Sequence, residues 1–199
     1  MKSSSGHTPR IAMLSIEDAK KAAIAEGISE MMAPLSIFRI LLKNPPLARE
    51  IGNTLNMLLF KGNQLDGRLR ELIIMRLGWA TGSNYEWTQH WRVAVGMNIP
   101  EDVILAVKDW KNSKILTDAD KAVLQATDDI LQNGAISDAA WKECVKHVPN
   151  EAAQLEIVAS IGNWRMISQI LLSLQVPLEE GVMSWPPLGE KPANAPADY

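Results

Sequence analysis

Apolar residues recur along this chain at the three- and four-residue spacing of an amphipathic helix, and no stretch shows the alternating polarity of a strand. Helices are predicted where such a run is opened by a capping residue and closed by glycine or proline. The clearest runs cover residues 16–25, 46–60, 118–133, 138–147 and 151–174. The pattern therefore predicts an all-α fold of about eight helices.

The stretch from Asp66 to Ile99 predicts two helices joined by a tight turn at Gly82. Nearly every position of the first helix is apolar, which is typical of a buried helix. Its two interior charges, Glu71 and Arg76, therefore need partners or altered ionisation. Desolvation would raise the pKa of Glu71 and suit it to acid–base work, whereas an ion pair with a core arginine such as Arg76 is the structural alternative.

The second helix carries three residues with possible chemical roles. Ser83 and Glu86 fit a capping box, with Ser83 as N-cap and Glu86 three residues later. Glu86 and His90 are four residues apart and share one face, so the carboxylate could orient the imidazole and fix its tautomer. A core histidine satisfied by Glu86 is the alternative. Gly96 is predicted as the left-handed helix stop, and Pro100 as the start of the next helix.

The spacing of Glu71, Ser83, Glu86 and His90 resembles the core motif of the carboxymuconolactone decarboxylase family, which includes the AhpD-like proteins. In the peroxidase branch of that family, a Glu is followed twelve residues later by Cys-x-x-Cys, and a His follows the second Cys by four. Here Ser83 and Glu86 stand at the two cysteine positions, so dithiol chemistry is excluded at this site. The resemblance implies a cysteine-free branch with an AhpD-like helical bundle.

For function, the resemblance implies a decarboxylase-like lyase that applies Glu/His acid–base chemistry to a small carboxylated lactone or related cyclic acid, as in aromatic compound catabolism. Lactone hydrolysis or isomerisation would need the same groups. His90, oriented by Glu86, is the expected general acid–base, and Glu71 assists it. The expected substrate contacts are Ser83, Tyr85 and Trp87.

Two other functions are weighed against this enzyme. A non-catalytic small-molecule-binding or scaffold relative would use the same residues as a capping box and buried ion pairs. A peroxidase is disfavoured because Cys144 is the only cysteine. A metal site built from Glu71, Glu86 and His90 is not expected, because no second histidine lies nearby in sequence. We also expect no cofactor.

Composition narrows the class of protein. The chain has 199 residues, of which 47% are hydrophobic, and a formal net charge of −3, as expected of a soluble globular protein with a substantial core. No basic stretch suggests a nucleic-acid partner and no apolar run suggests a membrane span. A single cysteine cannot form an internal disulfide, which fits a cytoplasmic location. We expect a homo-oligomer, either a trimer or hexamer or else a dimer.

The chain is predicted to contain a flexible segment at 1–14, one AhpD-like helical domain at 15–181 and a proline-rich tail at 182–199. The tail is either disordered or extended over a surface, and Trp185 could anchor it on a neighbouring subunit. Residues 155–162 echo residues 72–82, which suggests a degenerate internal repeat of a helical hairpin. In that echo, Arg165 is a weak candidate for binding a substrate carboxylate.

Overall fold

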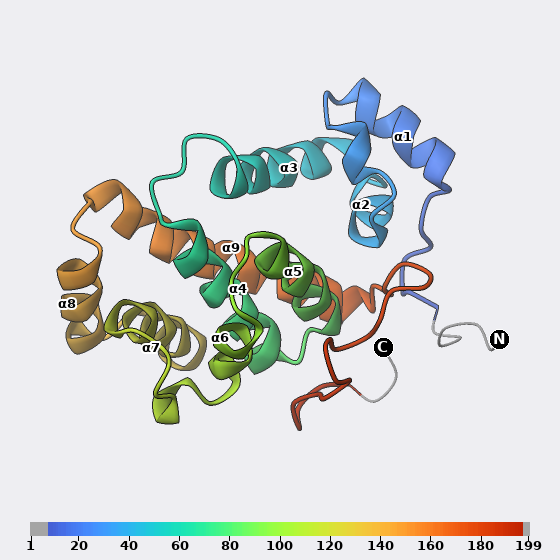
Figure 1. Cartoon of the computed structure of the whole chain (residues 1–199). Coiled ribbons are helices and arrows are strands. Elements are labelled where there is room, and N and C mark those ends of the chain that lie inside the picture. Colours follow the sequence, from blue (N-terminus) through green and yellow to red (C-terminus); the bar gives the residue numbers. More distant parts are fainter. Residues whose placement is uncertain (1–7, 197–199) are drawn as a thin grey trace. The chain divides into compact units, whose positions relative to one another are not determined.

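The computed structural model describes residues 8–196, which form nine α-helices, two short 3-10 helices and no strand (Figure 1). The predicted all-α fold is thereby confirmed. The helices are α1 (Ile16–Ala25), η1 (Glu30–Met32), α2 (Ser36–Leu41), α3 (Pro45–Leu59), α4 (Gly67–Thr81), α5 (Asn84–Gly96), α6 (Glu101–Ala106), η2 (Val107–Asn112), α7 (Asp118–Asn133), α8 (Asp138–His147) and α9 (Glu151–Leu174). Part of the segment predicted to be flexible, residues 1–7, lies outside the described residues.

Side-chain caps explain where several helices begin. Ser15, Asp66, Thr117 and Ser137 each accept a hydrogen bond from a backbone N–H in the first turn of α1, α4, α7 and α8 respectively. The end of α5 differs from the prediction. Gly96 stays helical, and Asn98 adopts the left-handed conformation with φ of 59°. Asparagine tolerates this conformation better than most residues, so it can end a helix without glycine.

The chain divides into two compact units, which are described separately. Within residues 8–196, the first unit holds residues 8–62 and 170–182, and the second holds residues 63–169 and 183–196. In the first unit, Arg10 N donates to Leu174 O and Ser36 N donates to a Glu179 carboxylate oxygen. These contacts join the start of that unit to the segment that follows α9.

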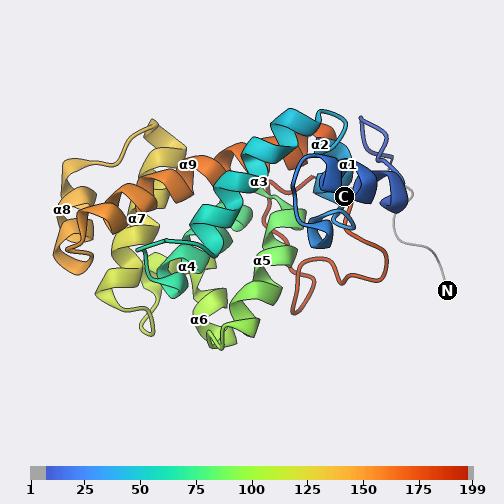
Figure 2. The same cartoon turned by 90° about the horizontal axis from the view of Figure 1, so that it is seen from above.

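In the second unit, α4 and α5 form the central hairpin, α7 packs on α4, and α8 packs beside α7 (Figure 2). Gly78 sets the closeness of the hairpin. A Cβ atom at this position would lie 2.9 Å from the backbone nitrogen of Trp87, so only glycine allows this approach. The first nineteen residues of α9, residues 151–169, belong to the same unit.

The core of the second unit is rich in aromatic side chains. Trp87 and Trp91 stack with ring centroids 6.1 Å apart, and Trp185 from the tail packs against Trp87 at the same separation. The indole N–H of Trp87 donates to Pro186 O at 2.8 Å, and the Asn194 side chain donates to Ala80 O. Residues 183–196 are therefore packed against the α4–α5 hairpin of their own chain. The predicted domain boundaries themselves stay a prediction.

Helix α9 is the one helix in residues 8–196 that is long and apolar enough, by length and composition, to cross a membrane. Its 18-residue window has a mean hydropathy of 1.2, and 44% of that window is buried inside the structure. This is weak evidence, because the core helix of a globular protein passes the same test. Buried side chains such as Ile157, Ile161 and Trp164 give α9 that core role in the second unit.

Candidate active site

Glu71 and His90 meet between the two helices of the central hairpin. Glu71 projects from α4 and is completely buried, and the His90 Nδ1 atom on α5 lies 2.8 Å from its Oε2 atom. Arg70 Nε donates to the other carboxylate oxygen of Glu71 at 3.2 Å. The predicted alternative partner, Arg76, instead forms a two-bond ion pair with Asp128. A buried carboxylate with these partners can hold and stabilise a positively charged imidazole.

The second ring nitrogen of His90 is also engaged. The indole N–H of Trp164, on α9, donates to His90 Nε2 at 2.9 Å, and the two rings meet edge to face. Indole nitrogen can only donate, so Nε2 must accept and carries no hydrogen. The ring hydrogen therefore sits on Nδ1 and is donated to Glu71. Glu71 and Trp164 thus fix the orientation of the His90 ring, with Nδ1 toward the carboxylate and Nε2 toward the indole.

The structure corrects the expected role of Glu86, because Glu71 rather than Glu86 orients His90. Glu86 is 2% exposed, and its Oε1 atom lies 2.9 Å from Ser168 Oγ on α9. Burial raises the pKa of Glu86 well above its ordinary value, although the Ser168 hydrogen bond acts in the opposite direction. Sharing one helix face with His90 permitted a contact, but Ser168 offers a hydrogen-bond partner on another helix.

The predicted capping box between Ser83 and Glu86 is not formed. Ser83 is the N-cap of α5 but makes no side-chain capping bond, and its hydroxyl is buried without a hydrogen-bond partner. The Oε2 atom of Glu86 is likewise buried and without a partner. The first turn of α5 therefore presents two buried polar atoms with unused hydrogen-bonding capacity.

The remaining predicted site residues are placed as follows. Tyr85 is buried in the first turn of α5. Trp87 is fully buried in the aromatic core, where its indole N–H donates to Pro186 O. Arg165, the weak candidate for binding a carboxylate, donates to the carbonyl of Ile130 at 3.0 Å. Glu71 and His90 are therefore in direct contact, and His90 and Glu86 each form a hydrogen bond with a residue of α9. Trp87 and Arg165 are instead used in packing and backbone contacts.

Two residues that touch this site, Trp164 and Ser168, escaped sequence reasoning as site members. A signal for them exists, because Ser160, Trp164 and Ser168 recur every fourth residue on α9 and so share one face. Sequence alone does not say that this face meets Glu86 and His90. Across the described residues, no group of three or more His, Cys, Asp and Glu side chains is arranged to hold a metal ion.

Cys144, on α8, has the environment of a structural cysteine. It is fully buried, its thiol contacts the carbonyl oxygen of Ala122, and burial raises its pKa to about 11. The thiolate is the reactive form, so this cysteine is poorly suited to nucleophilic or redox chemistry.

Comparison with protein families matches residues 45–129 to the carboxymuconolactone decarboxylase family. The matched region contains α4 and α5, including Glu71, Ser83, Glu86 and His90. None of the curated proteins matches the chain.

Several solved structures share the fold at low sequence identity. A variant of the debrominase Bmp8 in complex with 2,3,4-tribromopyrrole superposes with a TM-score of 0.71 at 19% identity, over 88% of this chain and 94% of that chain. An uncharacterised peroxidase-related protein with an AhpD core, from Ralstonia eutropha, gives 0.70 at 14% identity, over 87% and 94%. A protein of unknown function from Agrobacterium tumefaciens, suggested to be an AhpD antioxidant defence protein, gives 0.63 at 20% identity, over 69% and 94%.

The family match and the shared helical fold agree with the motif spacing in α4 and α5. Residues 45–129 thus match the carboxymuconolactone decarboxylase family, and the chain has an AhpD-like fold without a cysteine pair at the positions of Ser83 and Glu86.

Proposed function

We propose that this protein is an acid–base enzyme of the decarboxylase type that acts on a small carboxylated lactone or a related cyclic acid. The observation that carries this proposal is the buried hydrogen bond between Glu71 and His90. Loss of carbon dioxide from such a lactone leaves an enolate-like intermediate that must be protonated. A histidine backed by a buried carboxylate is suited to that transfer near neutral pH.

In this mechanism the Glu71 carboxylate accepts a hydrogen bond from Nδ1 of His90. The transferred proton is a second one, which Nε2 carries and exchanges with the substrate. The indole N–H of Trp164 donates to Nε2 in the structure. Substrate binding must therefore displace the Trp164 indole or shift His90 away from it before proton transfer. Once His90 is protonated, the Glu71 carboxylate stabilises its positive charge, as carboxylates do in other acid–base pairs.

The complex of a fold relative with 2,3,4-tribromopyrrole supports the choice of a small cyclic ligand. That protein has its own chemistry, and at 19% identity only the fold carries over. The support concerns the size and flatness of a molecule that such a fold can accommodate.

A non-catalytic binding protein is the second candidate, and the Trp164 hydrogen bond favours it. Both ring nitrogens of His90 are already satisfied, as they would be in a structural core histidine. A peroxidase is less well supported, because the positions of the cysteine pair hold Ser83 and Glu86 and the thiol of Cys144 is buried.

A turnover assay on a panel of carboxylated lactones, with detection of released carbon dioxide, tests the first candidate. We expect His90→Ala to lower kcat by about a hundredfold or more, because general acid–base groups contribute on that scale. Trp164→Phe removes the indole donor while keeping an aromatic ring, and it should retain turnover. His147→Ala, on α8, is the matched control and should behave as the wild type.

Circular dichroism and thermal melting would confirm that each variant is folded. Full activity of folded His90→Ala would eliminate the mechanism. Ligand-induced stabilisation of the wild type across the panel, with no product from any compound, would instead support the binding protein.

A further inference from the structure

A chain of hydrogen bonds runs from the end of α4 through Ser168 on α9 to Glu86 in the first turn of α5, and its hydrogens can be counted. Thr81 Oγ1 lies 2.7 Å from Leu77 O and 3.2 Å from Ser168 Oγ, and Ser168 Oγ lies 2.9 Å from Glu86 Oε1. These three contacts need three hydrogens, one for each. The hydroxyls of Thr81 and Ser168 supply two. Thr81 must then share its single hydrogen between Leu77 O and Ser168 Oγ, unless Glu86 itself carries a third hydrogen.

The charge environment agrees with this count. Glu86 is 2% exposed, and its hydrogen-bond partner is a neutral hydroxyl, whereas the neighbouring carboxylate of Glu71 has the guanidinium of Arg70. Burial without a charged partner disfavours the ionised form of a carboxyl group, which is the direction of the raised pKa of Glu86. Two buried carboxyl groups on adjacent helices thus have different partners, a guanidinium for Glu71 and a neutral hydroxyl for Glu86.

A protonated Glu86 leaves its second oxygen available. Oε2 is buried and has no hydrogen-bond partner, and the same holds for Ser83 Oγ, three residues earlier and 1% exposed. Buried polar atoms without partners are rare in folded proteins and are costly unless a ligand or water satisfies them. Both atoms lie at the N-terminus of a thirteen-residue helix, whose dipole favours negative charge.

We propose that Glu86, as a neutral carboxylic acid, and Ser83 form a two-donor site for the anionic oxygen of an enolate or phenolate on a small ring. The Glu86 carboxyl can turn about its Cγ–Cδ bond, so that its hydrogen moves from the Ser168 side to the ligand side. Ser168 then donates to Glu86, and only the longest contact of the chain, between Thr81 and Ser168, loses its hydrogen. An acid kept neutral by burial is an effective donor to an oxyanion at neutral pH.

This site deepens the proposed function, on which the choice of ligand class rests. Decarboxylation of a lactone carboxylate releases carbon dioxide and leaves negative charge on the lactone carbonyl oxygen, which the two donors would receive. His90, after taking one proton from solvent at Nε2, would then give that proton to carbon. The two positions that hold cysteines in the peroxidase branch would then bind an oxyanion instead of cycling between thiol and disulfide.

Binding of 4-nitrophenol tests the site without any turnover, because the absorption spectrum distinguishes bound phenolate from bound phenol. We expect the wild type to bind the phenolate form in preference. Ser83→Ala and Glu86→Leu should each weaken phenolate binding by about tenfold or more, as expected for hydrogen bonds to a charged group. Glu86→Gln keeps a neutral donor of similar shape and should stay within about threefold of the wild type. Ser160→Ala removes another buried unpaired hydroxyl and is the matched control.

The opposite pattern would overturn the proposal. If Glu86 is ionised, the wild type will reject phenolate, and Glu86→Gln will bind it far more tightly than the wild type does. Absence of phenolate binding by the wild type, or equal affinity in all variants, would also contradict it. As a second measurement, the infrared band of a protonated carboxyl group should disappear in Glu86→Gln at neutral pH, and its absence in the wild type would refute the neutral acid.

The two proposals can fail separately. Phenolate binding that depends on Ser83 and Glu86, with no lactone turned over, would leave the oxyanion site intact and remove the decarboxylase. Turnover that depends on His90, with phenolate binding unchanged by substitution of Ser83 or Glu86, would support the decarboxylase and remove the oxyanion site.

Discussion

His90 and Glu86 show how residues four positions apart on one helix acquire different chemistry from their partners. His90 lies between a carboxylate and an indole donor, and its tautomer is fixed by both. Glu86 faces the hydroxyl of Ser168 in a buried environment, and this burial raises the pKa of its carboxyl group well above the ordinary value. At the residue scale, therefore, the site pairs a potential base with a potential acid.

The raised pKa of Glu86 predicts a dependence of stability on pH. Above its ordinary value of 4.5, the unfolded chain loses this proton while the folded protein keeps it, so the unfolded state binds fewer protons. Stability then falls as pH rises from that value toward the folded pKa, and is unaffected by this group at lower pH. Glu86→Gln removes the effect and should raise Tm by several degrees at pH 7, with a smaller gain at pH 4.

Thermal melts of wild type and variant across that pH range provide the measurement. Glu143→Gln is the comparison, because Glu143 is exposed and its pKa is lowered mainly by a hydrogen bond from Lys146. It should give no gain in Tm at pH 7. A Glu86→Gln variant that melts below the wild type at pH 7 and matches it at pH 4 would mean that the buried group is a stabilising carboxylate.

At the scale of the elements, α4 and α5 start in different ways although each has a polar residue at its N-cap. Asp66 accepts from the backbone N–H groups of Arg68 and Leu69, at 3.0 and 3.1 Å, and so caps α4. Ser83 occupies the N-cap of α5 without a side-chain capping bond. A residue that begins a helix but leaves its hydroxyl unused is consistent with a role in binding rather than in capping.

This difference predicts unequal costs of two similar substitutions. Asp66→Ala should lower the free energy of unfolding by about 1 kcal/mol, which is typical of a lost cap. Ser83→Ala removes a buried hydroxyl that has no partner, so it should cost less or be neutral. Urea unfolding of both variants under the same conditions gives the comparison. A larger loss for Ser83→Ala than for Asp66→Ala would show that Ser83 does cap α5.

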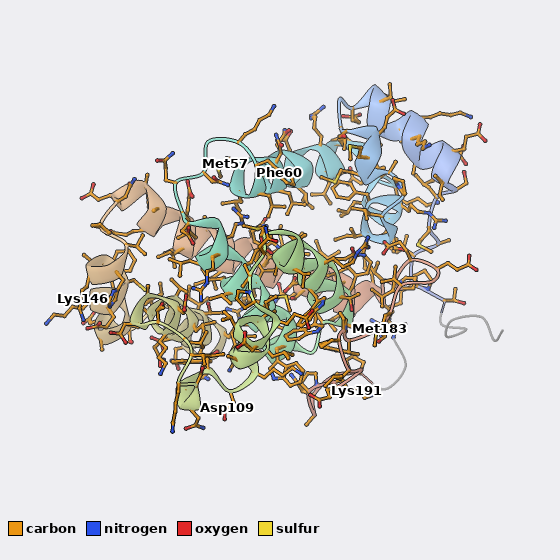
Figure 3. All side chains as sticks on the ribbon, viewed as in Figure 1. Met57, Phe60, Asp109, Lys146, Met183 and Lys191 are labelled. Carbon is orange, nitrogen blue, oxygen red and sulfur yellow. The ribbon has the colours of Figure 1, made fainter. Side chains whose placement is uncertain are left out.

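For the whole molecule, residues 183–196 complete the second unit although they lie at the far end of the chain from α4 and α5. Trp185 is buried beside Trp79 and Trp87, and Lys108 pairs with Glu190 while lying over the Trp79 ring. Figure 3 shows where Met183 and Lys191 of this segment lie. The segment thus contributes a core side chain to its own chain, while the predicted homo-oligomer stays a prediction.

Trp185→Ala should therefore destabilise the second unit strongly, by about 3–5 kcal/mol, as expected when a buried tryptophan is truncated. Leu188 lies in the same segment but is 71% exposed, so Leu188→Ala should change the free energy of unfolding little. Chemical denaturation followed by tryptophan fluorescence, supported by circular dichroism, measures both. Equal stability of the two variants would mean that the segment does not contribute to the core in solution.

The sequence by itself determined the helices and the family resemblance, because the signals for both are local. Capping residues such as Thr117 and Ser137 precede apolar runs, and their hydrogen bonds reach only three residues along the chain, so α7 and α8 begin and end where they were predicted. The spacing from Glu71 to His90 is likewise contained in one hairpin. The resemblance could therefore be recognised without any tertiary contact.

Only the tertiary structure decided which groups meet. The four-residue spacing of Glu86 and His90 allows a contact but does not force one, and the partners of both come from other helices. Such pairings depend on how α4, α5 and α9 are rotated and packed against one another, which no local pattern encodes. The same reason explains Trp185. It is buried against Trp87, which lies about a hundred residues earlier in the chain. The orientation of the His90 ring and the raised pKa of Glu86, and with them the proposed chemistry, follow from packing.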